Sequence, residues 1–307
     1  MILIIGSEEE AHSKHIFDAL TARNEDVEYW DTRNFPFVNR INWYPTEDIN
    51  NGNFIINNKK IDFKDIKSIY WRWNYGFNVV YANKSVPNAK YVEAIINYDL
   101  TATAESIYKS LKCNWVNGID AINMHKTKAF QLHTMAQLGI RIPKTLISND
   151  KEEVRKFAEE NNYDLIYKPV QGGGHTKALT KDDLTDERLK TLNSGAVQFQ
   201  EKLDGVDIRV YVIGDKIFPA EIRAKTVDFR DDNSAEIVPV SLPENICNQC
   251  LKIMDKFKLK YTGIDIKTKS NGEYVFIEAN PAPMFTFFEK KSGYPITETL
   301  CDFLINT

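Results

Sequence analysis

The sequence YDLIYKPVQGGGHTKAL occupies residues 163–179 and joins a strand-like run to three consecutive glycines. A plain surface turn needs one or two glycines. Three in succession indicate a backbone that bends sharply and lets a ligand approach closely. Because Lys168 closes the strand just before the loop, the expected ligand is negatively charged, and phosphate is the first candidate.

On both sides of this loop the chain alternates strands with helices, which indicates an α/β fold. Short strands are expected at MILIIG, DVEYWD and IKSIYWRW, and a long helix over residues 89–111. The last third changes character, with strands over 196–203, 207–215 and 216–224 and a hairpin over 261–281 whose turn is Asn271-Gly272. We therefore divide the chain into three parts, which are residues 1–118, 119–190 and 191–307.

Composition excludes several classes of protein. The 307 residues carry 39 Lys+Arg against 43 Asp+Glu, a net charge of -4, and no basic run or RNA-binding aromatic motif is present. The apolar stretches are far shorter than the roughly 20 residues that span a bilayer. The N-terminus lacks the basic start of a secretion signal. We expect a cytoplasmic protein that binds neither nucleic acid nor membrane, and a homodimer remains an open option.

The cysteines agree with a reducing compartment. Cys247 and Cys250 have CxxC spacing, but no second pair follows at zinc-finger distance, so structural cysteines are favoured over a redox or metal site. His12 and His15 lie one helical turn apart, and a solvated helix face is favoured over metal binding.

Polar residues interrupt an apolar hairpin near the C-terminus. In GIDIKTKSNGEYVFIEANP, residues 263–281, Glu278 and Asn280 are two apart and share a face, while Asp265 lies on the partner strand. Two carboxylates and an amide oxygen suit Mg²⁺, especially beside nucleotide phosphates. The alternative is a hairpin with a few exposed polar residues, which is less favourable because Glu and Asn inside an apolar strand are costly without a partner.

Between the glycine loop and this hairpin lies FQEKLDGVDIRV, residues 199–210. The strand end at Glu201, Lys202 and Leu203 could offer backbone amide and carbonyl groups to an adenine edge. Asp207 could accept from ribose hydroxyls. Arg209 alternates with apolar neighbours, so we expect it to point away from the core, toward solvent or a cleft.

The motifs together resemble the ATP-grasp superfamily. The ordered series HKTKAFQLHTMAQLGIRIPKT, LIYKPVQGGG, FQEKLDGVDIRVYVIGDKIFPAEI and YVFIEANP is most similar to the branch of ribosomal-protein glutamate ligases and graspetide or microviridin-type macrocyclising ligases. SIYWRWNYG and AEIRAKTVDFR resemble segments of its peptide-modifying members. The resemblance covers about residues 115–305. It implies two α+β subdomains that grip ATP, preceded by a small open α/β domain.

The resemblance also implies the chemistry. ATP would convert a carboxylate of a peptide or protein, with or without a leader segment, into an acyl phosphate, and an amine or hydroxyl would then displace phosphate, leaving ADP. The cofactors would be ATP and Mg²⁺. For ATP, the implied phosphate ligands are Lys128 and Lys168, the lid over the phosphates is Gly172, Gly173 and Gly174, and the adenine and ribose contacts are Glu201, Lys202, Leu203 and Asp207. The implied metal ligands are Asp265, Glu278 and Asn280. The implied catalytic residues are Arg209 and Lys168, and the implied substrate-side cations are Arg223 and Arg230.

Several alternatives remain open. Lys126 competes with Lys128 as the phosphate ligand. After EANP the family pattern would continue with a small polar pair, whereas this chain has Ala282-Pro283-Met284-Phe285, and the aromatic residues of MFTFFE could line a peptide site or pack in the core. A small-molecule kinase and a nucleotide-dependent binding module without chemistry are the alternative functions.

Overall fold

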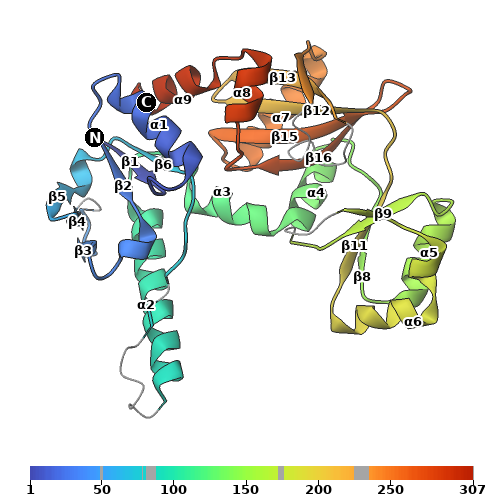
Figure 1. Ribbon diagram of the computed structural model, residues 1–307, viewed down its shortest axis with the longest axis horizontal. Helices are drawn as coiled ribbons and strands as arrows, with labels where there is room; N and C mark the ends of the chain where they lie inside the picture. The colour runs from blue at the N-terminus through green and yellow to red at the C-terminus, as the bar shows by residue number, and fades with distance from the viewer. Residues whose placement is uncertain (49–50, 78, 81–87, 172–175, 225–234, 307) are drawn as a thin grey trace. The chain divides into compact units, whose positions relative to one another are not determined.

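A computed structural model describes residues 1–48, 51–77, 79–80, 88–171, 176–224 and 235–306 (Figure 1). Its contacts divide the chain into two compact units. The first unit comprises Met1–Ile122, Lys258–Tyr261 and Ala282–Thr307, and the second comprises Asn123–Phe257 and Thr262–Pro281. The C-terminal segment thus belongs to the same unit as the N-terminus, a grouping that differs from our three-part division by sequence.

The first unit is built on a parallel four-stranded sheet of order β2-β1-β6-β7. All four residues of β1 are buried, as expected for a parallel strand covered on both faces. The strands are β1 (Ile2–Ile5), β2 (Val27–Trp30), β6 (Ser68–Trp71) and β7 (Asn114–Val116). The helices are α1 (Ala11–Thr21), α2 (Ala89–Ser110), α3 (Ile119–Asn123, which ends one residue into the second unit), α8 (Thr286–Ser292) and α9 (Ile296–Ile305).

The helix α9 completes this unit although it lies at the other end of the chain. It contacts α1 and β6, and Ser68 Oγ donates to the Leu304 carbonyl at 2.6 Å. The buried Ser68 hydroxyl therefore has its partner in the C-terminal helix.

A second, small sheet in the first unit was not predicted. It consists of β3 (Arg40–Trp43), β4 (Gly52–Ile56) and β5 (Lys59–Asp62), followed by a short 3₁₀ turn. The turn between β4 and β5 is Asn57-Asn58, and both residues have positive φ, as a tight two-residue hairpin turn requires. Phe54 on β4 is fully buried and its ring packs 4.5 Å from that of Trp30, so this sheet extends the same core.

The second unit contains two sheets. The four-stranded sheet has the order β10-β9-β11-β8, and α5 packs against it. Asp150 caps α5 by accepting from the Glu152 and Glu153 amides, the usual role of an aspartate at the start of a helix. The elements are α4 (Lys128–Gln137), β8 (Thr145–Ser148), α5 (Lys151–Glu160), β9 (Leu165–Lys168), β10 (Lys177–Ala178), α6 (Asp186–Leu189) and β11 (Val197–Glu201).

The five-stranded sheet of the second unit has the order β14-β13-β12-β15-β16, and the pairs β12–β13, β13–β14 and β15–β16 are antiparallel. Gly214-Asp215 joins β12 to β13, and Gly272, with φ 84°, forms the turn between β15 and β16. The second of these turns was predicted from Asn271-Gly272. The elements are β12 (Val206–Ile213), β13 (Lys216–Arg223), β14 (Glu236–Pro239), α7 (Glu244–Lys256), β15 (Tyr261–Thr268) and β16 (Tyr274–Asn280).

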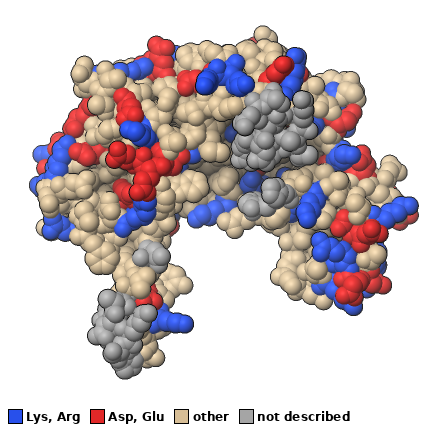
Figure 2. Space-filling model, viewed as in Figure 1, with Lys and Arg blue, Asp and Glu red and all other residues tan. Residues whose placement is uncertain are grey.

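The surface carries both signs of charge. On the face shown in Figure 2, Lys and Arg side chains are interspersed with Asp and Glu. No helix in the described part of the chain has the length and apolar character needed to cross a membrane. Cys113, Cys247, Cys250 and Cys301 are all free thiols, and burial raises the pKa of Cys250 to about 12.

Candidate active site

The predicted metal hairpin, β15 and β16, contains a bulge that determines which side chains share a face. Asp265 pairs with Glu278, but Ile266 pairs with Phe276, so Ile277 is an extra residue on β16. Directly paired residues point to the same face. Because of the extra residue, Phe276 stays on the buried face with Ile266, while Glu278 turns to the opposite face beside Asp265.

Each of these carboxylates contacts a cation. Lys128 Nζ lies 2.6 Å from Glu278 Oε2, and both side chains are about four-fifths buried. Arg209 Nη1 lies 2.5 Å from Asp265 Oδ1. Lys128 is the first residue of α4, and Arg209 lies on β12, the strand next to β15. Four elements, α4, β12, β15 and β16, therefore bring two anions and two cations into one cluster.

Arg209 is fixed more firmly than the sequence indicated. The residue is only 7% exposed, so it does not point into solvent. Its guanidinium lies 5.2 Å from the centre of the Tyr211 ring, which is two residues along the same strand. Burial opposes its charge, but the carboxylate of Asp265 and the ring of Tyr211 outweigh that effect and raise the pKa of Arg209.

Gly263 provides the space for this guanidinium. A Cβ atom at Gly263 would lie 2.6 Å from Arg209 Nη2 and 2.8 Å from Cζ and Nε. The motif GIDI therefore needs glycine because an arginine from the neighbouring strand lies against its backbone.

We expect Gly263→Ala to lower turnover by about tenfold to a hundredfold, because the methyl group displaces the Arg209 guanidinium from Asp265 and small misplacements in a reacting site are costly. ADP release in the peptide assay described below measures the effect. Gly118→Ala is the matched control, since a Cβ there meets only Trp115 Cβ at 3.8 Å. Full activity of Gly263→Ala would mean that turnover does not depend on the position of the Arg209 guanidinium.

Lys168 belongs to the same electrostatic cluster. Burial lowers its pKa, with Lys128 adding to the effect, while Glu278 and Asp265 act in the opposite direction. The carboxylates of Asp265 and Glu278 thus lie among three basic side chains, those of Lys128, Lys168 and Arg209. Burial alone would raise the pKa of Glu278, but Lys128 and Lys168 outweigh burial, so the pKa of Glu278 is lowered.

Asp265 behaves differently from Glu278. Burial and the nearby charge of Glu278 raise its pKa, against the opposing effect of Arg209. Two adjacent carboxyl groups thus have pKa values shifted in opposite directions, an arrangement typical of functional sites. His125, which the sequence analysis did not select, is half-buried near Lys128 and Glu278, and burial lowers its pKa. Its position three residues before Lys128 is the signal that could have identified it.

The strand end predicted to contact adenine is partly occupied by internal bonds. The Glu201 amide donates to the Lys144 carbonyl, and the Lys202 amide donates to the Asp164 carbonyl, both at 3.0 Å. Among residues 201–203, all of which the structure describes, the Leu203 amide is therefore the remaining candidate donor to an adenine base. Asp207 forms an exposed ion pair with Lys267 at 3.1 Å.

The remaining predicted residues either have exposed side chains or lie outside the described part of the chain. Arg223 is exposed at the end of β13 and pairs with Glu221 at 2.7 Å. Lys126 is exposed, whereas Lys128 contacts Glu278. Gly172, Gly173, Gly174 and Arg230 lie outside the described residues, so their predicted roles stay predictions.

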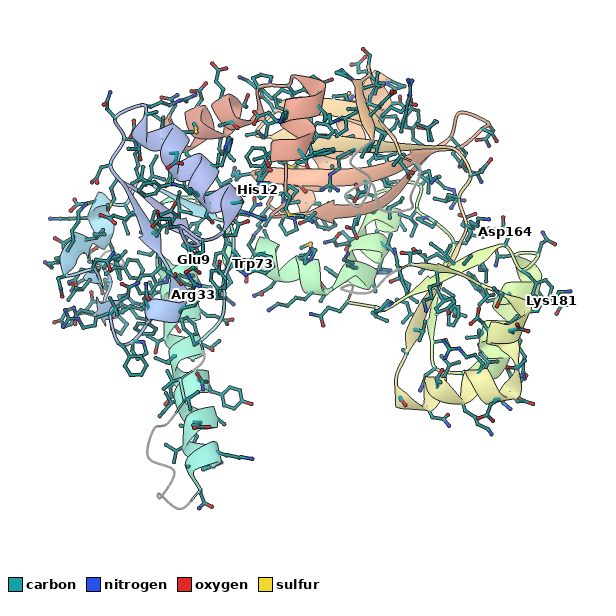
Figure 3. The ribbon with its side chains drawn as sticks, viewed as in Figure 1. Glu9, His12, Arg33, Trp73, Asp164 and Lys181 are labelled. Carbon is teal, nitrogen blue, oxygen red and sulfur yellow. The ribbon has the colours of Figure 1, made fainter. Side chains whose placement is uncertain are left out.

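In the first unit, the strand end SIYWRWNYG has a structural partner. Arg72 is 3% exposed, pairs with Glu10 at 3.1 Å and donates to the Ala282 carbonyl at 2.7 Å. Nearby, Arg33 pairs with Glu9 at 2.5 Å, and Figure 3 shows Arg33, Glu9 and Trp73 on one side of this unit. Arg72 thus ties the C-terminal segment to the strand ends.

The MFTFFE segment packs mostly in the core. Phe285 and Phe288 are 1% exposed, whereas Met284 and Phe287 remain at the surface. Of the two open readings of this segment, the structure favours core packing for Phe285 and Phe288.

The donor set of the hairpin fits a magnesium ion. Asp265 and Glu278 present carboxylates on one face, and Asn280 follows Glu278 by two residues on the same strand. These are hard oxygen ligands. Two carboxylates and one amide oxygen leave coordination positions free, which substrate phosphates fill in the usual magnesium site. The described residues contain no group of three or more His, Cys, Asp or Glu side chains that could hold a metal ion.

The comparison with protein families decides the class of this fold. The RimK-like ATP-grasp domain matches residues 124–304. The chain belongs to the RimK-like ATP-grasp family. It is an ATP-dependent, ADP-forming ligase with the ATP-grasp fold that the sequence predicted, preceded by a unit with a parallel sheet.

Individual relatives agree with this assignment. The alpha-aminoadipate–LysW ligase LysX of Sulfurisphaera tokodaii is 23% identical over 250 residues, which is 76% of this chain and 85% of that protein. The ATP-grasp ligase PsnB, in complex with a phosphomimetic variant of minimal precursor, Mg and ADP, superposes with a TM-score of 0.84 at 29% identity over 99% of this chain and 97% of PsnB. Macrocyclase MdnC from Microcystis aeruginosa MRC, bound with precursor peptide MdnA, shares the fold at TM-score 0.83 and 24% identity, over 100% of this chain and 99% of MdnC.

Proposed function

We propose that this RimK-like ATP-grasp ligase activates a carboxylate of a peptide and joins it to an amine or hydroxyl of a peptide. The observation that carries the proposal is the similarity to PsnB, which extends over 99% of the chain and so includes most of residues 1–123, which lie outside the ATP-grasp family match. PsnB is seen with a precursor peptide variant, Mg and ADP. The cluster of Lys128, Lys168 and Arg209 around two carboxylates supports the same chemistry.

We assign the roles from the geometry of the cluster. Asp265, Glu278 and Asn280 would hold Mg²⁺, which when bound neutralises charge on the phosphates. Lys128 and Lys168 stand beside Glu278 and would neutralise further phosphate charge, as positioned cations do in phosphoryl transfer. Gly172–Gly174 would cover the phosphates and exclude water.

Arg209 has a separate role in this proposal. One of its nitrogens contacts Asp265, which leaves the rest of a planar guanidinium to face a second anion. We place the reacting carboxylate there. The carboxylate oxygen attacks the terminal phosphorus of ATP and ADP leaves; the nucleophile then attacks the acyl carbon and phosphate leaves. Arg223 and Arg230 would attract the acidic peptide from the surface.

A mass assay tests the proposal. The purified protein is incubated with Mg·ATP and a pool of acidic peptides containing lysine and threonine, with free amino acids present. We expect a peptide that loses water in step with ADP release, the signature of an internal amide or ester.

Other products would redirect the assignment. A peptide that gains an amino-acid residue would indicate tailing, the reaction class suggested by the names of the amino-acid ligase relatives. A product that gains a phosphoryl group would indicate a kinase. Tight Mg-dependent ATP binding without ADP formation across a wide acceptor screen would indicate a nucleotide-dependent binding module.

A further inference from the structure

Arg141 lies between the two sheets of the second unit and contacts both. It stands in the segment GIRIPKT, ahead of β8. Its Nη2 lies 2.9 Å from Glu201 Oε1, and its Nε lies 3.2 Å from Glu273 Oε1. Arg141 lies within the motif HKTKAFQLHTMAQLGIRIPKT, but neither the motif nor the proposed reaction gives this arginine a role.

On one side, Arg141 fixes the end of β11. The Glu201 carboxylate is only 14% exposed and also accepts from the Lys144 amide at 2.8 Å. The same glutamate donates its own amide to the Lys144 carbonyl. Glu201 is therefore held through both its side chain and its backbone, and Leu203 follows two residues later.

On the other side, Arg141 fixes the hairpin of β15 and β16. Glu273 stands next to the turn, and the Phe276 amide donates to the Arg141 carbonyl at 2.8 Å. Glu278, which contacts Lys128, follows Phe276 across the bulge. One residue thus binds the strand end assigned to adenine and the strand assigned to the metal.

Arginine suits this position for a physical reason. Its planar guanidinium can donate in two directions at fixed angles, whereas a lysine offers a single flexible point charge. The three side chains are partly exposed, at 36% for Arg141 and 39% for Glu273, so the pairs add only modest stability. The main effect of these ion pairs is to fix the relative positions of β11 and the hairpin of β15 and β16.

We propose that Arg141 is a positioning residue that sets the spacing between the adenine strand and the metal hairpin, and thereby the fit of ATP. This inference rests on the proposed roles of residues 201–203 and of the hairpin. It predicts that loss of Arg141 weakens the binding of ATP selectively and leaves the binding of peptide unchanged.

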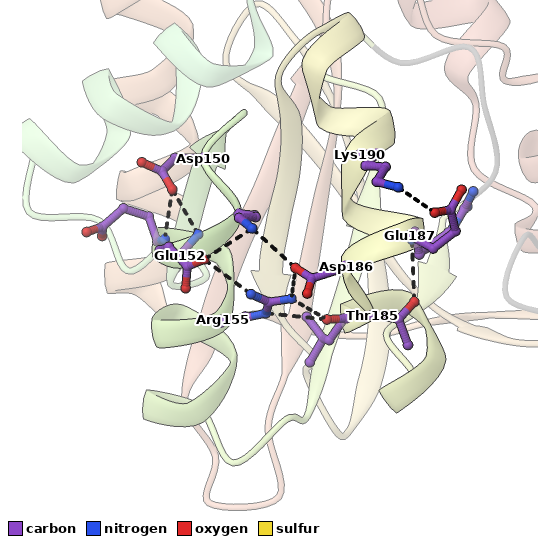
Figure 4. A network of polar contacts seen from close by, with 11 residues as sticks. Asp150, Glu152, Arg155, Thr185, Asp186, Glu187 and Lys190 are labelled. Atoms are coloured by element: carbon purple, nitrogen blue, oxygen red, sulfur yellow. Dashed lines mark hydrogen bonds and ion pairs between the residues drawn. The ribbon is translucent and has the colours of Figure 1, made fainter.

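The test compares Arg141→Gln and Arg141→Lys with a matched control. Arg155 is that control: it is similarly exposed, it pairs with Asp186 at 2.9 Å and Glu152 at 3.2 Å, and its network lies on α5 and α6 (Figure 4). Calorimetry measures the affinity for Mg·ATP, and steady-state kinetics measure KM for ATP, KM for peptide and kcat.

We expect Arg141→Gln to weaken Mg·ATP binding and raise KM for ATP by about tenfold, the effect of losing a charged hydrogen bond. KM for peptide should stay within twofold, and Arg155→Gln should match the wild type. Arg141→Lys should recover part of the loss, and Glu273→Gln should reproduce part of it.

Two results would overturn the inference. One is an Arg141→Gln variant that binds Mg·ATP like Arg155→Gln. The other is a variant that loses ATP affinity, peptide affinity and thermal stability together, which a purely structural role would produce. The calorimetric result does not require turnover, so absence of ligation by the wild type would count against the proposed function and leave this test intact.

Discussion

Glu278→Gln is expected to lower ADP release by about a hundredfold or more while the protein stays folded, because positioned charges around a transferring phosphoryl group supply effects of this size. The substitution keeps the shape of the side chain but removes its charge from the pair with Lys128. The same charge is one of the two carboxylates proposed for Mg²⁺. Peptide-dependent ADP release and circular dichroism measure the two halves of this expectation.

The control for this experiment is Glu152→Gln. Glu152 pairs with Arg155 at 3.2 Å on the surface of α5, so its loss should change neither measurement. Undiminished turnover of Glu278→Gln would remove Glu278 from the metal site and leave it as a structural partner of Lys128.

Lys168→Met is expected to lose turnover to a similar extent without losing stability. Burial lowers the pKa of Lys168, which means that the fold disfavours its charged form. Methionine is of similar length and carries no charge, so the cost of burying the ammonium disappears. Turnover should fall because a cation next to Glu278 is lost.

The lowered pKa of Lys168 also predicts how the difference in stability between Lys168→Met and the wild type changes with pH. Below the folded pKa of Lys168 the lysine is charged in both the folded and the unfolded chain, and the stability advantage of Lys168→Met is complete. As pH rises through the lowered folded pKa toward 10.5, the folded wild type releases its proton first, and the advantage narrows. Thermal melts of the wild type and Lys168→Met at several pH values measure this difference, with Lys156→Met as the control. A wild type more stable than Lys168→Met at neutral pH would contradict the prediction.

Much of the fold could be predicted from local patterns. Asp150 marks the start of α5, and the turns at Gly214-Asp215 and Asn271-Gly272 mark two hairpins, because these residues act over a few positions. The sheet of β3, β4 and β5 was missed. Its strands are short and the Asn57-Asn58 turn lacks the usual glycine.

The candidate site shows the same limit. The sequence singled out Asp265, Glu278 and Arg209 by their polarity in apolar strands. It could not give their contacts, because the first residues of β12 and β15, Val206 and Tyr261, are 55 positions apart (261 − 206). Gly263, which faces Arg209, lies on the neighbouring strand, and the pairing of two distant strands leaves no local signal in the sequence. The bulge at Ile277 also breaks the simple alternation by which faces are assigned.

The packing of α9 against α1 and β6 has a consequence for the order of events in the cell. A ribosome makes strands β1 to β7 of the first unit before it makes the second unit, but Ser68 finds its acceptor, the Leu304 carbonyl, only after α9 has emerged. Arg72 likewise waits for Ala282. The first unit therefore completes its contacts only after the whole sequence of the second unit has been made, although its own synthesis begins earlier.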